Sequence, residues 1–129
     1  MPIDKVKQGR TNRRKGAEFE LRVRKDLESK GWYVSKYQNN IDLIDDKMIA
    51  AKSSRFRLQS TGFPDFICWR ISRDDYQVIG VECKTNGYLD RTEKAKCKWF
   101  VDQGIFHKIL VAKKIKVKNR IQIEYRQVE

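Results

Sequence analysis

Hydrophobic residues recur with a helical period between residues 16 and 30. Phe19, Val23 and Leu27 are spaced four residues apart, which places their side chains along one face of an α-helix. The glycine that follows residue 30 is a common C-terminal stop. At about 100° per residue, Glu20 falls next to this hydrophobic row, so we expect a helix that directs one carboxylate towards the core. A partly buried salt bridge to a lysine or arginine is the alternative explanation of that position, because an unpaired buried charge is costly.

The remaining hydrophobic runs are short and rich in β-branched and aromatic residues, as is typical of strands. We expect strands at 32–37, 66–71, 78–84, 106–112 and 120–126. The short polar link between the second and third of these runs predicts an antiparallel hairpin. A second helix is expected from Asp90 or Thr92 to the residue before Gly104, with a basic connection over 113–119 between the last two strands.

Two segments have no clear hydrophobic period. Residues 1–15 are strongly basic, and we expect a flexible basic arm there. Residues 38–62 look like an insertion, for which we expect a short helix or turn around 48–51 followed by a loop rich in serine and arginine. Residues 16–129 then form a single α/β domain, with a central mixed sheet flanked by helices and an active site at one edge.

The composition indicates the partner class. The chain has 129 residues and a formal net charge of +12, which favours a polyanion such as nucleic acid, although basic proteins that bind no nucleic acid also exist. No apolar run is long enough to span a membrane and the N-terminus lacks a signal-like stretch, so a cytoplasmic location is expected. With three scattered cysteines and one histidine, a metal would have to be held by carboxylates.

Charged residues at the end of the strand over 78–84 are the candidate chemistry. Period-two geometry places Glu82 and Lys84 on the same face as Gly80, and the glycine leaves room for a molecule to approach. Alternatively, these charges could form the solvent-exposed face of a half-buried strand. Asp65, however, enters the partner strand of the same hairpin, and Glu20 comes from a helix that must pack nearby. Three carboxylates could hold a hard divalent cation, while a lysine could orient and help deprotonate a water or stabilise charge on a phosphate.

These residues carry a resemblance to a known superfamily. The pair "PD" at 64–65 followed by "ECK" at 82–84 resembles the PD-(D/E)xK nuclease motif. The stretch "RRKGAEFE" at 13–20 is similar to the start of the archaeal Holliday-junction resolvases, in which the catalytic glutamate lies four residues after the glycine. Counting from Gly16 in the same way leads to Glu20. The likeness covers about residues 13–114.

The resemblance implies a restriction-endonuclease-like core and a role for each site residue. Asp65, Glu82 and the backbone carbonyl of Cys83 would bind Mg²⁺ or Mn²⁺, Glu20 would complete or support the metal site, and Lys84 would serve the attacking water. The implied activity is metal-dependent DNA cleavage in recombination and repair, and symmetric cutting of a four-way junction implies a homodimer with twofold symmetry.

Two features depart from the resolvases, namely Leu21 in place of a frequent arginine and the long segment 38–62. Other PD-(D/E)xK nucleases, of the virus-type replication-repair or restriction-like classes, therefore stay open as alternatives, as does a non-catalytic nucleic-acid-binding module. Basic side chains are the candidate phosphate contacts. They are Arg13, Arg14, Lys15, Arg55, Arg57, Lys94, Lys96 and Lys98.

Overall fold

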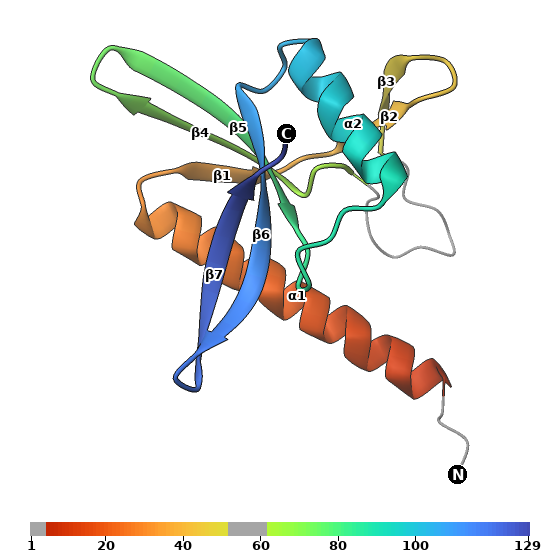
Figure 1. The fold of residues 1–129 in the computed structure, drawn as a ribbon, viewed down its shortest axis with the longest axis vertical. Helices are drawn as coiled ribbons and strands as arrows, with labels where there is room; N and C mark the ends of the chain where they lie inside the picture. Colours follow the sequence, from red (N-terminus) through yellow and green to blue (C-terminus); the bar gives the residue numbers. More distant parts are fainter. Residues whose placement is uncertain (1–4, 52–61) are drawn as a thin grey trace.

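A five-stranded mixed sheet forms the centre of the protein (Figure 1). The computed structural model describes residues 5–51 and 62–129. Along the sheet the strands are β1 (Tyr33–Lys36), β4 (Phe66–Ser72), β5 (Asp75–Cys83), β6 (Lys108–Val117) and β7 (Arg120–Gln127). Neighbours are antiparallel except β5 and β6, which are parallel. The helix α2 (Arg91–Asp102) makes the crossover that a parallel pair requires. The chain is therefore mixed α/β, as the sequence predicts.

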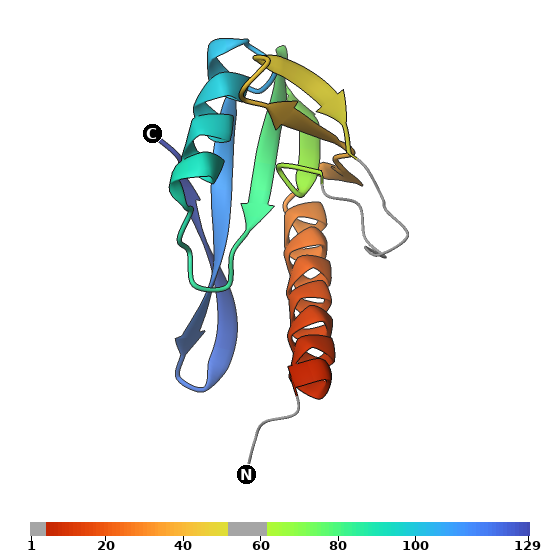
Figure 2. The ribbon, with the colours of Figure 1, turned by 90° about the vertical axis from the view of Figure 1, so that its right-hand side faces the viewer.

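The two helices cover opposite faces of the sheet (Figure 2). The helix α1 (Lys5–Ser29) buries the predicted row Phe19, Val23 and Leu27 against one face, where Ile79 and Val81 of β5 are fully buried. On the other face α2 buries Cys97 and Phe100 against residues of β6. Alternation along each strand therefore sends successive side chains of β5 towards different helices. None of the helices in the described ranges is long and apolar enough to cross a membrane.

The β4–β5 hairpin has the predicted antiparallel arrangement. Its register pairs Phe66 with Val81 and Ile67 with Gly80. The expectation that Gly80 leaves room for an approaching molecule is wrong, because the chain itself fills that space. A Cβ built on Gly80 would lie 2.8 Å from Cγ of Pro64. The glycine therefore lets the residue before Asp65 pack directly on β5.

A second, two-stranded sheet replaces the helix or turn expected around 48–51. It consists of β2 (Asn39–Asp42) and β3 (Lys47–Ala50). The Asp42 carboxylate accepts hydrogen bonds from the amides of Ile44 and Asp45, which stabilises the connecting turn. Side-chain hydrogen bonds of this kind are a common reason why aspartate favours turns over helix.

The first helix starts earlier than predicted. Residues 5–15, expected to belong to a flexible arm, continue α1 by about three turns, whereas residues 1–4 lie outside the described ranges. Arginine, lysine and glutamine have good helix propensity, and extending a helix that tertiary packing has already nucleated adds one hydrogen bond per residue. A hydrophobic period is not needed for that extension, which explains why the pattern did not reveal it.

The last two strands also extend further than predicted. Residues 113–117, expected to be part of a connection, continue β6, and β7 follows directly after a two-residue turn. Both turn residues, Lys118 and Asn119, have positive φ values of 50° and 64°. That geometry matches the right-handed twist of a tight hairpin, and asparagine accepts it readily. The β6–β7 hairpin therefore projects beyond the rest of the sheet (Figure 1).

Candidate active site

Asp65 and Glu82 form a reciprocal hydrogen-bonded pair at the end of the β4–β5 hairpin. The register that pairs Phe66 with Val81 places Asp65 opposite Glu82. The amide of Asp65 donates to Oε1 of Glu82 at 3.1 Å, and the amide of Cys83 donates to Oδ2 of Asp65 at 2.8 Å. Each carboxylate is therefore fixed by a backbone group next to the other carboxylate. The two predicted acids of the motif do meet in the structure.

Burial and the nearby charge of Asp65 both disfavour ionisation of Glu82. Of the charged residues that the structure describes, only Glu82 is buried, with 5% of its surface exposed. Burial first, and then the charge and side-chain hydrogen bond of Asp65, raise the pKa of Glu82 to about 10, although Lys84 opposes this rise. Glu82 therefore holds a proton at neutral pH. A buried acid kept close to a second acid is typical of a site that needs a cation or a proton between the two.

Lys84 is held beside the pair by an acid that the sequence analysis missed. Its Nζ lies 2.5 Å from Oε2 of Glu93, and the Glu93 side chain is only 15% exposed. Desolvation lowers the pKa of Lys84, but the hydrogen bond and charge of Glu93, followed by the charges of Glu82 and Asp65, outweigh it and raise that pKa. The ammonium group therefore suits charge stabilisation better than proton abstraction.

Glu93 is positioned by the start of α2. It is the third residue after the N-cap Asp90, and the two form a capping box: the Asp90 carboxylate accepts from the Glu93 amide, and the Glu93 carboxylate accepts from the Asp90 amide. One Glu93 oxygen thus caps the helix while the other binds Lys84. The sequence contained a signal for this arrangement, since Asp-x-x-Glu at a helix start is the capping-box pattern.

Glu20 lies at the same end of the sheet but approaches from the other face. It extends from α1, whereas Glu82 lies on the sheet face that α2 covers. Among the described residues, Glu20 is therefore not grouped with Asp65 and Glu82 as a third possible metal ligand. Its Oε2 is 3.4 Å from Nζ of Lys36, the salt bridge considered as its alternative explanation. Partial burial raises the pKa of Glu20 and the charge of Asp65 adds to the rise, while Lys36 opposes it. Glu20 therefore senses the pair electrostatically.

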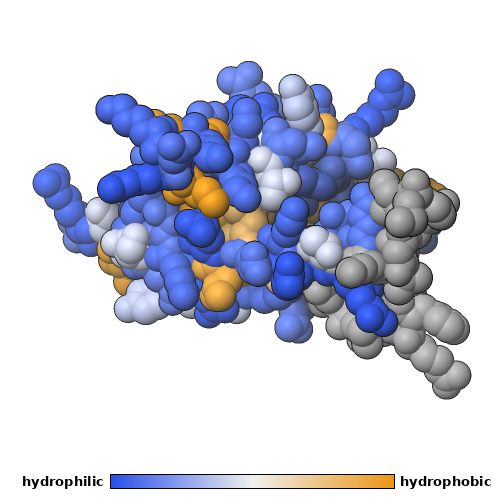
Figure 3. Space-filling view, turned by 90° about the horizontal axis from the view of Figure 1, so that it is seen from below, coloured by the Kyte–Doolittle hydropathy of each residue, from blue (hydrophilic) through white to orange (hydrophobic). Residues whose placement is uncertain are grey.

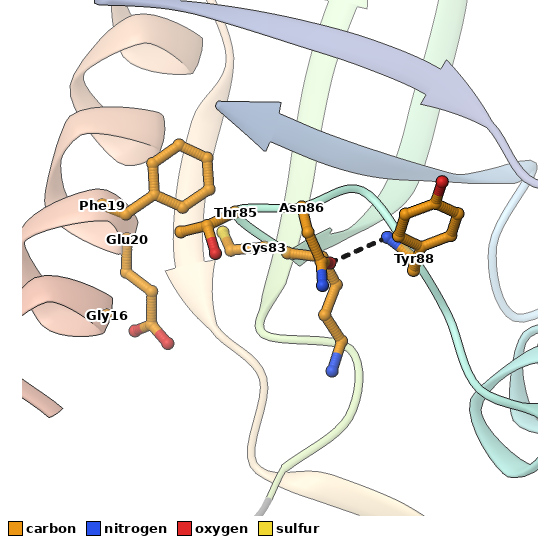
Figure 4. A pocket seen from close by; sticks show the side chains of 8 residues that line it. Gly16, Phe19, Glu20, Cys83, Thr85, Asn86 and Tyr88 are labelled. Carbon is orange, nitrogen blue, oxygen red and sulfur yellow. Dashed lines mark hydrogen bonds between the residues drawn. The ribbon is translucent and has the colours of Figure 1, made fainter. Parts of the chain in front are cut away.

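A pocket of about 280 Å³ lies between Glu20 and the end of β5. It lies between α1 and the loop that follows β5, and Figure 4 shows the Glu20 carboxylate on one side with Asn86 and Tyr88 on the other. Lys84 also contributes to the lining. Asn86 is held in place because its Oδ1 accepts a hydrogen bond from the Tyr88 amide at 3.0 Å. The pocket therefore reaches the end of β5, where Cys83 and Lys84 line it.

The donor set fits a hard cation with few protein ligands. Within the ranges that the structure describes, no three or more His, Cys, Asp or Glu side chains are grouped so that they could hold a metal ion. Asp65 and Glu82 provide two carboxylates. The two backbone hydrogen bonds described above use Oδ2 of Asp65 and Oε1 of Glu82, so neither involves the second oxygen of each carboxylate. Mg²⁺ is commonly bound through one or two carboxylates and keeps several waters. The paired acids meet that requirement without a third side chain.

The candidate phosphate contacts that the structure describes lie on two separate elements, α1 and α2. Arg13, Arg14 and Lys15 are exposed on α1, and Arg14 lies 3.9 Å from Glu18. The lysines at 94, 96 and 98 lie on α2, across the sheet. Nζ of Lys98 is 2.6 Å from Asp102, and Nζ of Lys96 lies 5.7 Å from the centre of the Phe63 ring. Arg55 and Arg57 lie outside the described residues.

No protein-family model matches the chain, and neither does any curated protein or solved structure. The proposed function therefore depends on the arrangement of these side chains.

Proposed function

We propose that the protein is a metal-dependent endonuclease with a restriction-endonuclease-like core, of the PD-(D/E)xK type, that hydrolyses phosphodiester bonds in DNA. The observation that carries the proposal is the pairing of Asp65 with the buried Glu82 through reciprocal backbone hydrogen bonds at 3.1 and 2.8 Å, with Lys84 two residues after Glu82. Without a cation, the burial of Glu82 and its repulsion by Asp65 are relieved only by a proton held on Glu82. A cation between them removes both penalties.

Each residue has a distinct proposed role. Asp65, Glu82 and the carbonyl of Cys83 would hold Mg²⁺ or Mn²⁺, and such an ion supplies Lewis-acid stabilisation and an activated water when it is bound. Lys84, kept as an ammonium group by Glu93, stabilises the negative charge that develops on the phosphate. Glu20 supports the site from the α1 side of the pocket. The chain itself thus positions the phosphate and balances its charge.

Branched DNA is the proposed substrate, with a four-way junction first among the branched forms. This choice depends on the sequence "RRKGAEFE" before and at Glu20 and on the net charge of +12, which supplies non-specific affinity for phosphates. A resolvase cuts two strands symmetrically, so the proposal includes a homodimer with twofold symmetry.

Cleavage assays with matched variants test the proposal. Labelled four-way junction, linear duplex, flap and single strand are incubated with Mg²⁺, Mn²⁺ or EDTA. Wild type is compared with Glu82→Ala and with Glu124→Ala, an exposed glutamate on β7. We expect metal-dependent paired nicks in the junction that Glu82→Ala abolishes and Glu124→Ala retains.

The other outcomes are equally informative. Cleavage of the linear or flap substrates would support the nuclease proposal but contradict the proposed preference for junctions. Tight DNA binding without cleavage in either metal would refute the enzyme and favour a non-catalytic binding module.

A further inference from the structure

The β6–β7 hairpin carries a dense cluster of positive charge that the proposed function has not used. Within residues 113–120 there are five basic residues and no acidic residue. They are Lys113, Lys114, Lys116, Lys118 and Arg120, and all are exposed. Among the described residues, no ion pair joins any of them to a carboxylate. Their charge is therefore available to an external polyanion.

The hairpin is attached to the loop that lines the pocket. The amide of Lys84 donates to the carbonyl of Ala112 at 3.0 Å, and the amide of Lys114 donates to the carbonyl of Thr85 at 3.2 Å. Nη2 of Arg126 on β7 donates to the carbonyl of Gly87 at 2.8 Å. These bonds connect the base of the hairpin to the residues beside the proposed catalytic lysine. A phosphate backbone held by the hairpin would consequently lead directly to the pocket.

Two of the lysines face the same side of the sheet as α1. Ala112 belongs to the core beneath α1, so Lys114 and Lys116, which follow it at intervals of two, point to that side. Figures 1 and 2 show that the hairpin and the N-terminal half of α1 project from the same end of the molecule, with the loop after β5 between them.

That end of the molecule, seen from below in Figure 3, is predominantly hydrophilic. The N-terminal half of α1 contributes the exposed Arg10, Arg13 and Lys15. Exposed basic residues therefore lie on α1, which lines the pocket, and on the hairpin that is bonded to the loop lining it.

We propose that the β6–β7 hairpin is a phosphate-binding arm that, opposite α1, holds the sugar-phosphate backbone of nucleic acid at the pocket. The inference deepens the proposed nuclease function and rests on it for the identity of the polyanion. Contacts to phosphate fix the position of a duplex without reading its sequence. These two basic elements would together align one strand with Lys84.

The salt dependence of binding tests the arm without any need for cleavage. Binding to fluorescently labelled duplex and four-way junction is measured by anisotropy in EDTA, over about 50 to 200 mM salt. The test variant is Lys114→Gln with Lys116→Gln. The matched control removes two exposed charges elsewhere, Lys47→Gln on β3 and Arg73→Asn at the tip of the β4–β5 hairpin. Asparagine suits the second position because Arg73 has a positive φ of 56°.

Each lost phosphate contact lowers the slope of log K against log salt by about 0.9. We expect the hairpin variant to lose about 1.8 in slope, which makes its affinity about tenfold less sensitive to salt over that range. The control is expected to keep the wild-type slope. Equal losses in the two variants, or no loss in the hairpin variant, would overturn the proposal, and circular dichroism establishes that both variants fold.

The outcome separates this inference from the nuclease proposal. Binding with the expected change in slope, but no cleavage on addition of metal, would retain the arm and refute the enzyme. Metal-dependent cleavage with an unchanged slope in the hairpin variant would retain the enzyme and refute the arm.

Discussion

Replacing Glu82 with glutamine is expected to stabilise the metal-free protein while abolishing its proposed activity. Glutamine has the shape of a protonated glutamate, so its carbonyl oxygen can accept the Asp65 amide as Oε1 of Glu82 does at 3.1 Å. Its amide can donate to the Asp65 carboxylate, as a protonated Glu82 would. The substitution therefore keeps the contacts and removes the need to hold a proton.

The magnitude follows from proton linkage. The pKa of Glu82 is raised from 4.5 to about 10 in the folded protein, so between these values the native state binds a proton that the unfolded chain releases. Unfolding free energy then falls by at most about 1.4 kcal/mol per pH unit as the pH rises. The cost is absent below pH 4.5 and reaches about 3 kcal/mol at pH 7. Glu82→Gln is free of it.

Urea unfolding in EDTA, followed by tryptophan fluorescence from about pH 5 to about pH 8, measures this difference. We expect the stability advantage of Glu82→Gln over wild type to grow with pH. Glu124→Gln, at an exposed position on β7, controls for the loss of one negative charge and should follow wild type. Parallel pH profiles for wild type and Glu82→Gln would show that the pair does not retain a proton, and the reasoning would fail.

Three further changes test other parts of the site. Glu93→Gln keeps the capping box but removes the ion pair to Lys84. Single-turnover cleavage should then slow by about tenfold, with little change in KM or melting temperature. An unchanged rate would contradict the role of Glu93. Gly80→Ala forces a Cβ to within 2.8 Å of Pro64 and should lower the free energy of unfolding by about 1–3 kcal/mol in urea titrations, whereas wild-type stability would mean that Pro64 moves freely. If Asp65 and Glu82 bind the cation as proposed, saturating Mg²⁺ should raise the melting temperature of wild type but not of Glu82→Ala; equal shifts would place the ion elsewhere.

The sequence predicted those parts of the fold that depend on local pattern. The row Phe19, Val23 and Leu27 identified the buried face of α1, and the polar link before β5 identified the antiparallel hairpin that brings Asp65 to Glu82. The strands β2 and β3 escaped prediction because each is four residues long and they are held together by a turn rather than by an alternating hydrophobic pattern.

The errors in the site have a common physical cause, which is tertiary packing. The wheel correctly placed Glu20 beside the buried row, but only the path of α1 across the sheet decides that it approaches from the face opposite Glu82. Likewise, a glycine in a strand indicates a close approach without saying by what, and at Gly80 the approaching group is Pro64. Lys84 was singled out by its motif. Its partner Glu93 was missed although the predicted start of α2 fits a capping box, because its ion pair to Lys84 depends on how the helix packs.

The position of both acids within one hairpin affects how the protein folds. Asp65 and Glu82 are 17 positions apart in the chain, so they meet as soon as β4 and β5 pair, before α1 or β7 has to dock. Local pairings of this kind form early because they close short loops. Repulsion between the two carboxylates therefore opposes an early step, and refolding of the metal-free chain should accelerate as the pH falls towards 4.5, where a growing fraction of Glu82 is protonated before the strands pair.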